Sequence, residues 1–183
     1  MRIKTDLVQA LVIDIQEKLV VAMPEKEKLI NKTVQLLKGL QLLQIPVTIT
    51  TQYAKGLGET ISEIRQLNQN GLEYDKLSFG AFGNREIRMA LAEKQRRQVI
   101  VCGIEAHICV LQTVLDLLEA GYQPIVVTDC VASRNKEDEK VAYIRMKQSG
   151  AIFTTGESLL YELMATAKSE VFPSILELVK NNK

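Results

Sequence analysis

Short apolar runs rich in β-branched residues recur along the chain, and longer segments with helical spacing separate them. The runs span residues 10–14, 46–50, 98–102 and 123–127, with a weaker fifth run at 151–154. Such alternation is typical of a parallel sheet buried between two layers of helices. We therefore expect an α/β fold in the form of a three-layer sandwich.

The intervening segments carry helix signals. Residues 27–43 place Ile30, Val34, Leu37 and Leu40 on one stripe, as an amphipathic helix requires. Asn84 is a suitable N-cap and glycine a suitable stop. Further helices are expected over residues 84–93, 109–120, 136–149 and 169–180.

The length of 183 residues suits one domain. We find no internal repeat, low-complexity tract or linker, and the glycine-containing stretch at 55–59 is short enough to be a loop. The sequence predicts a single domain over residues 1–183.

Charge and cysteine content narrow the function classes. Twenty-three basic residues face 22 acidic ones, mixed along the chain, and the densest cationic run, at 94–97, reads as a solvated helix-to-strand loop. This distribution argues against nucleic-acid binding. Three cysteines, no secretory signal and no apolar run of about 18 residues predict a cytoplasmic protein that does not enter the membrane.

Three polar residues stand out as candidates for chemistry. Asp14 ends the first predicted strand, Cys109 follows the third, and Lys76 lies in a separate polar segment. Ligands of open α/β sheets bind beyond the carboxyl ends of the strands. These three side chains are therefore the first candidates for a ligand site at that edge of the sheet.

Each candidate has a catalytic and a structural interpretation. At a helix start, Cys109 would be favoured as a thiolate nucleophile, or it is a small buried residue. Asp14 is suited to act as a general base, or it caps a helix or pairs with a cation. Lys76 can stabilise the thiolate and keep Asp14 ionised, or it is a surface lysine.

Taken together, these segments resemble the isochorismatase-like cysteine hydrolases, and most closely the isochorismatase-domain proteins of unassigned substrate. The resemblance runs from about residue 6 to about residue 163. Its motifs are residues 11–16, 74–79, 102–110 and 145–151, of which the cysteine motif at 102–110 is the most specific.

The resemblance implies a six-stranded, mainly parallel sheet flanked by helices, and a catalytic triad of Asp14, Lys76 and Cys109. It further implies a thioester intermediate and a non-proline cis peptide between Ile104 and Glu105. The backbone N–H groups of Glu105 and Cys109 would then bind the oxyanion.

The chain departs from the nicotinamidases of this family, which hold a metal through an aspartate and histidines. Its one histidine, His107, lies inside the cysteine motif, so we expect neither a metal nor another cofactor. His107 is either a second base or, more often for a lone histidine, a structural hydrogen-bonding residue.

Four residues are expected to rim a small cleft, namely Gln16, Tyr53, Phe79 and Phe82. The aromatic residues can equally be core packing. Glu105 and the loop residues Ser133, Arg134 and Asn135 are candidates for further polar contacts.

We favour a cysteine hydrolase that cleaves a small amide, carbamoyl or related C–N substrate. The alternative is a catalytically idle relative that binds a metabolite or a partner protein. A thiol redox protein would need Cys102 or Cys130 close to Cys109. For the favoured hydrolase we expect a small-molecule substrate and a homo-oligomer.

Overall fold

A six-stranded parallel sheet forms the centre of the computed structural model, which describes residues 1–68 and 73–180. The strands are β1 (Val8–Ile13), β2 (Val47–Gln52), β3 (Glu73–Lys76), β4 (Gln98–Ile104), β5 (Gln123–Ala132) and β6 (Ile152–Thr154). Their order is β3-β2-β1-β4-β5-β6, and every neighbouring pair is parallel. This confirms the predicted fold class.

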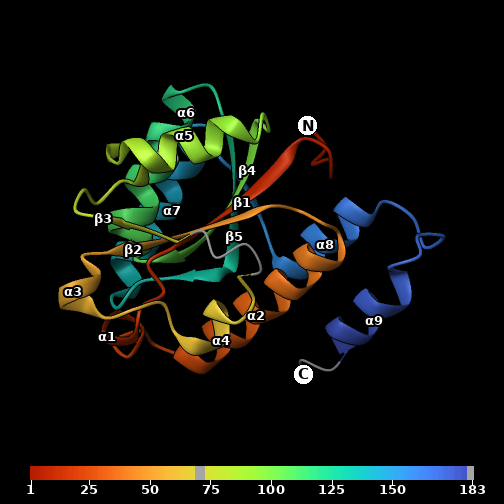
Figure 1. Cartoon of the computed structure of the whole chain (residues 1–183), viewed down its shortest axis with the longest axis horizontal. Helices are drawn as coiled ribbons and strands as arrows, with labels where there is room; N and C mark the ends of the chain where they lie inside the picture. Colours follow the sequence, from red (N-terminus) through yellow and green to blue (C-terminus); the bar gives the residue numbers. More distant parts are fainter. Residues whose placement is uncertain (69–72, 181–183) are drawn as a thin grey trace.

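Helices cover both faces of the sheet (Figure 1). One layer contains α2 (Lys26–Leu42), α4 (Ser62–Arg65), α8 (Gly156–Met164) and α9 (Phe172–Lys180), and the other contains α5 (Arg85–Glu93), α6 (Leu111–Glu119) and α7 (Lys136–Gln148). The shorter α1 (Glu17–Val20), α3 (Ala54–Leu57), η1 (Ala81–Gly83) and η2 (Ala106–Val110) lie in the connections.

Strand β1 shows how the sequence fills both layers. All six of its residues are buried. Ala10 and Val12 pack into the core cluster under α2, whereas Leu11 and Ile13 pack into the cluster under α6. Successive side chains of a strand point to opposite faces, so a strand covered on both sides must be apolar at every position, as the run at residues 10–13 is.

Three local expectations were wrong. Strand β3 was not predicted, because its residues are mostly polar and it lies at the edge of the sheet, with only β2 as a described neighbour. Residues 54–57 form the short helix α3 instead of a loop. Cys109 lies inside the π-helical turn η2 instead of at the first position of an α-helix.

The turn η2 has a specific hydrogen-bonding cause. The amides of Ile108 and Val110 both donate to the carbonyl oxygen of Glu105, at 3.0 and 3.2 Å. The bond from Val110 spans five residues, which is the spacing of a π-helix. The α-helical spacing begins at Leu111.

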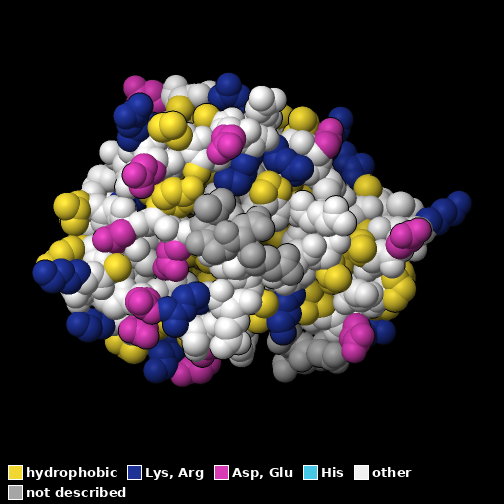
Figure 2. Space-filling model, viewed as in Figure 1, with side chains coloured by type: hydrophobic (Ala, Val, Ile, Leu, Met, Phe, Trp, Pro, Cys, Tyr) yellow, Lys and Arg dark blue, Asp and Glu magenta, His cyan; other side chains and the backbone are white. Residues whose placement is uncertain are grey.

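The cationic run at residues 94–97 is the predicted helix-to-strand loop, since it joins α5 to β4. Its side chains are not simply solvated: Lys94 donates to Thr48, Arg96 donates to two backbone carbonyl groups, and Arg97 lies over the ring of Tyr122. On the face seen in Figure 2, basic and acidic side chains are interspersed.

Within the described residues, no helix is long and apolar enough to cross a membrane.

Gly103 is required where β4 passes β1. Its φ is +126°, and a Cβ atom there would lie 2.0 Å from the carbonyl oxygen of Ile13. We expect Gly103→Ala to lower the free energy of unfolding by roughly 3 kcal/mol or more, because backbone must move to remove the clash. Chemical denaturation measures this loss.

Gly121→Ala is the matched control. Gly121 also has a positive φ, +77°, but no atom lies within 4 Å of the added Cβ. Its loss should stay near the roughly 1–2 kcal/mol of a left-handed residue. Equal losses for the two variants would contradict the close-approach argument.

Candidate active site

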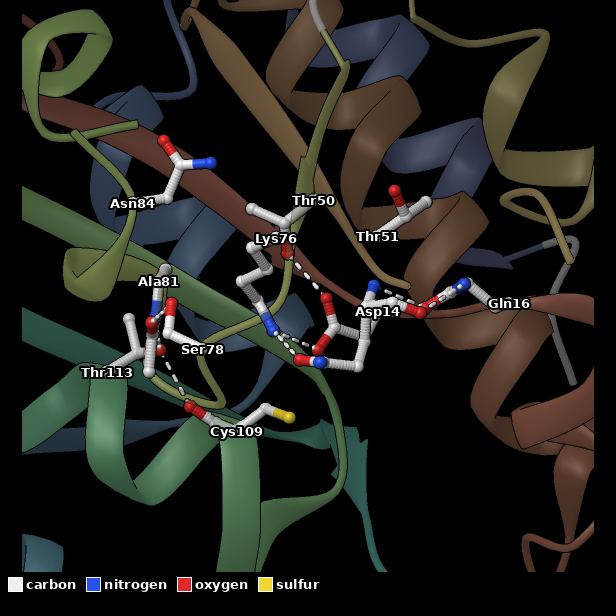
Figure 3. A network of polar contacts seen from close by, with 12 residues as sticks. Asp14, Gln16, Thr50, Thr51, Lys76, Ser78, Ala81, Asn84, Cys109 and Thr113 are labelled. Atoms are coloured by element: carbon white, nitrogen blue, oxygen red, sulfur yellow. Dashed lines mark hydrogen bonds and ion pairs between the residues drawn. The ribbon is translucent and has the colours of Figure 1, made fainter. Parts of the chain in front are cut away.

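Polar side chains converge at the carboxyl edge of four adjacent strands. Asp14 follows β1, Gln52 ends β2, Lys76 ends β3, and η2 with Cys109 follows β4. Because the strands are parallel, all four ends lie at one edge of the sheet. Residues more than 90 positions apart in the sequence are thereby brought together (Figure 3).

The centre of this group is an ion pair between Lys76 and Asp14. The distance from Nζ to Oδ2 is 2.7 Å, and both side chains are 0% exposed. The other carboxylate oxygen of Asp14 accepts a hydrogen bond from the Thr50 hydroxyl at 2.7 Å. The ammonium group of Lys76 also donates to Oε1 of Gln52 at 2.8 Å. Both buried charges therefore have polar partners, as burial requires.

Cys109 lies against this pair. Its thiol interacts electrostatically with both charged groups, and the residue is 6% exposed. Burial and the Asp14 carboxylate raise the pKa of the thiol to about 12, although Lys76 acts in the opposite direction. The resting thiol is therefore protonated. This corrects the expectation that a helix start would favour the thiolate, because desolvation has the larger effect.

The segment carrying Cys109 is held from several sides. The Thr113 hydroxyl donates to the Cys109 carbonyl at 2.6 Å and accepts from the Ala81 amide at 2.9 Å. The peptide bond between Ile104 and Glu105 is cis. The Glu105 carboxylate is buried and accepts hydrogen bonds from the Arg134 backbone N–H and guanidinium, at 2.9 and 3.0 Å.

His107 bonds to the neighbouring loop. Its Nδ1 lies 2.9 Å from the hydroxyl of Ser133, and its Nε2 lies 3.9 Å from Asp138. Ser133 lies in the segment that joins β5 to α7, and Asp138 lies in α7. These contacts favour the structural interpretation of the histidine.

The side chains of two of the expected cleft residues are engaged within the protein. The side chain of Gln16 is buried and bonds to the backbone of Gln52 and Gly58. Phe82 packs edge-on against Tyr122, which precedes β5 and so lies toward the opposite edge of the sheet. Loop position alone did not reveal these buried partners.

Tyr53 and Phe79 remain candidates for the mouth of the site. They are 47% and 55% exposed, and each follows closely on a residue of the network, Gln52 and Lys76 respectively. The backbone N–H of Tyr53 donates to the Lys76 carbonyl at 2.9 Å.

The arrangement disfavours the redox interpretation. Cys102 and Cys130 lie in the core cluster under α2, whereas Cys109 lies in the cluster under α6, across the sheet. Burial raises the pKa of both distant thiols. Neither is placed to resolve an oxidised Cys109.

Thr50 and Gln52 were missed by the sequence reasoning. The run of three polar residues at 50–52, at the end of the strand, is a signal that could have found them. Among residues 1–68 and 73–180, no group of three or more His, Cys, Asp or Glu side chains is placed to hold a metal ion.

Comparison with known proteins gives consistent matches. The model of the isochorismatase domain matches residues 9–158. Isochorismatase domain-containing protein 2 of Bos taurus is 38% identical over 154 residues, 84% of this chain and 74% of that protein. The match covers most of this chain and about three quarters of that protein.

Two solved structures share the fold. That of the MAR1 ribonuclease from Caenorhabditis elegans has a TM-score of 0.92 at 34% identity, covering 98% of this chain and 93% of the other. The YcaC product of Escherichia coli, an octameric hydrolase of unknown specificity, has a TM-score of 0.90 at 22% identity, covering 99% and 96%.

The buried ion pair predicts a large and specific loss of stability. Lys76→Met leaves the Asp14 carboxylate without its cation in the core, and we expect a loss of roughly 3–5 kcal/mol in the free energy of unfolding. The double variant Lys76→Met/Asp14→Asn removes both charges and should recover part of this loss. Denaturant titration measures each value.

Lys140→Met is the matched control, because its 2.6 Å pair with Glu137 is exposed to solvent. That pair should contribute less than about 1 kcal/mol. A loss for Lys76→Met no larger than for Lys140→Met would contradict the importance assigned to the buried pair.

Proposed function

This chain belongs to the isochorismatase family of hydrolases, and from that premise we propose that it is a cysteine hydrolase. Its substrate is a small molecule with an amide, carbamoyl or related C–N bond. One observation carries the proposal: a buried ammonium–carboxylate pair lies at the carboxyl edge of the sheet, within electrostatic reach of a buried thiol.

The protonated state of Cys109 assigns the roles. The thiol attacks the substrate carbonyl carbon while its proton passes to the Asp14 carboxylate, so Asp14 acts as the general base. The ammonium of Lys76 stabilises the negative charge that develops on sulfur. The nucleophile thus forms only when a substrate is present to accept it.

Addition to the carbonyl group places a negative charge on its oxygen. The backbone N–H groups of Glu105 and Cys109 are the proposed donors to this oxyanion. The hydrogen bonds from Ile108 and Val110 to the Glu105 carbonyl support this role, because they hold the turn between the two donors.

Breakdown of the adduct completes the first half of the reaction. The protonated Asp14 returns its proton to the leaving nitrogen, the C–N bond breaks, and ammonia or an amine departs from a Cys109 thioester. Water then attacks the thioester with Asp14 again as base, which releases the acid and restores the thiol. Atoms and protons balance without a further reactant.

The idle binding protein is less well supported. A buried lysine and aspartate contribute little to affinity, and such a pair is often less stabilising than apolar residues of the same size. A catalytic role explains better why the Lys76–Asp14 pair lies beside a cysteine. Tyr53 and Phe79 are the proposed contacts for an apolar part of the substrate.

Nucleic acid remains an unexpected substrate, although one structural neighbour is named a ribonuclease. The cationic run at residues 94–97 lies at the amino end of β4, away from Cys109, and its side chains are engaged within the protein. Because that neighbour is named a ribonuclease, the activity assay includes an RNA substrate.

Assembly and location are further parts of the proposal. YcaC is octameric, which supports a homo-oligomer for this chain. All three cysteines are free thiols, which supports a reducing compartment such as the cytoplasm.

The decisive experiment compares wild type with Cys109→Ala on a panel of small primary amides and carbamoyl compounds. We expect ammonia release and an acyl adduct on Cys109, detected by intact mass, from wild type alone. Cys102→Ala is the matched control and should retain activity, since Cys102 lies across the sheet.

Equal ammonia release by wild type and Cys109→Ala would refute the nucleophile. Cleavage of an oligoribonucleotide by wild type, without any amide turnover, would replace the proposed substrate class.

The raised pKa of Cys109 gives a prediction for the enzyme without substrate. Three units above the ordinary value of 9.0 correspond to about a thousandfold less thiolate near pH 8. Alkylation by iodoacetamide should therefore be at least about a thousandfold slower than for an unperturbed thiol, and its rate should keep rising with pH beyond 9. A plateau near neutral pH would contradict this assignment.

A further inference from the structure

Gln52 connects the ion pair to the rest of the sheet. Its side-chain oxygen accepts from the Lys76 ammonium at 2.8 Å, and its side-chain nitrogen donates to the Leu77 carbonyl at 2.9 Å. The second bond fixes the orientation of the amide, because only the nitrogen can donate to a carbonyl. The oxygen must then face Lys76.

Gln16 holds the backbone of the same residue. Its side-chain oxygen accepts from the Gln52 N–H at 2.7 Å, while its nitrogen donates to the Gln52 carbonyl at 3.1 Å and to the Gly58 carbonyl at 2.7 Å. Gln16 is fully buried and Gln52 nearly so. Gln16 therefore holds the backbone of the residue whose side chain accepts from the ammonium group.

We propose that Gln52 is a positioning residue, which aims the Lys76 ammonium at the Cys109 sulfur, and that Gln16 fixes the backbone from which Gln52 acts. This inference rests on the proposed role of Cys109 as nucleophile.

The geometry of an ammonium group explains the need for Gln52. Lys76 has three N–H donors. Asp14 and Gln52 accept from this group, and the nearby Cys109 thiol interacts with it electrostatically. With Asp14 as its one anchor, the Nζ atom would be free to move by rotation about the bonds of the lysine side chain. Gln52 is a second anchor from another strand, and two anchors fix the position of Nζ relative to the Cys109 thiol.

Charge explains why the residue is an amide. A glutamate at this position would also accept from Lys76, but its negative charge would oppose thiolate formation on Cys109. A leucine of similar size would remove the acceptor and keep the volume. The two substitutions therefore separate orientation from packing.

The test measures alkylation of Cys109 by iodoacetamide between pH 7 and 10.5 for wild type, Gln52→Leu and Gln52→Glu, with intact-mass detection. Cys109→Ala supplies the blank for the two other thiols. Below its pKa a thiol reacts in proportion to its thiolate fraction. We expect on the order of tenfold slower reaction at each pH for Gln52→Leu, equal to one pKa unit, and a larger decrease for Gln52→Glu.

Gln41→Leu is the matched control. Its side-chain nitrogen donates to a backbone carbonyl, that of Leu67, on the outer helix α2 and away from Lys76. It should follow the wild-type curve. Thermal melting of all variants is measured alongside. A packing defect alone would lower the melting temperature and leave the pH profile of alkylation unchanged.

The variant Lys76→Met separates a failure of the positioning role of Gln52 from a failure of the proposed role of the lysine. If it shifts the profile while both Gln52 variants follow the wild-type curve, the positioning role is refuted and the proposed function stands. If Lys76→Met itself leaves the profile unchanged, the proposed role of the ammonium is refuted together with that of Gln52.

Discussion

A lysine ammonium without access to water is stable only where protein acceptors replace its hydration, and the Lys76–Asp14 pair meets this condition where four strands end. Thr50 and Gln52 satisfy the remaining polar atoms from the strand between them. Burial raises the pKa of the adjacent Cys109 thiol, and the two members of the pair act on that pKa in opposite directions. Strand order, buried charge and the proposed chemistry therefore depend on one another.

Much of the fold was predictable because burial on both faces leaves a strong signal. The runs in β1, β4 and β5 are apolar at nearly every position, and Asn84 caps α5 as expected, accepting from two backbone amides. Strand β3 lacked this signal because an edge strand buries less of its surface. The π-helical turn at Cys109 was equally hidden, since it depends on two amides that share one carbonyl group.

The candidate site was predictable in part, for a related reason. Asp14 and Cys109 follow apolar strands, so position alone drew attention to them. The partners of Gln16 and Phe82 were not predictable, because the direction of a loop side chain depends on groups distant in the sequence, here the Gln52 backbone and Tyr122. Lys76 was a candidate only as a polar residue in a polar segment, and nothing in the surrounding sequence marks it as buried.

The edge position of β3 has a consequence for how the protein loses function. Lys76 is supplied by a four-residue strand with one described neighbour, whereas Asp14 and Cys109 are attached to the sheet centre. Detachment of an edge strand requires less free energy than global unfolding. Such fraying would leave an intact core that holds the Asp14 carboxylate and the Cys109 thiol without the Lys76 cation. The proposed hydrolase should therefore lose activity at denaturant concentrations below those that unfold the core. The edge strand β3 would then set the upper temperature for activity.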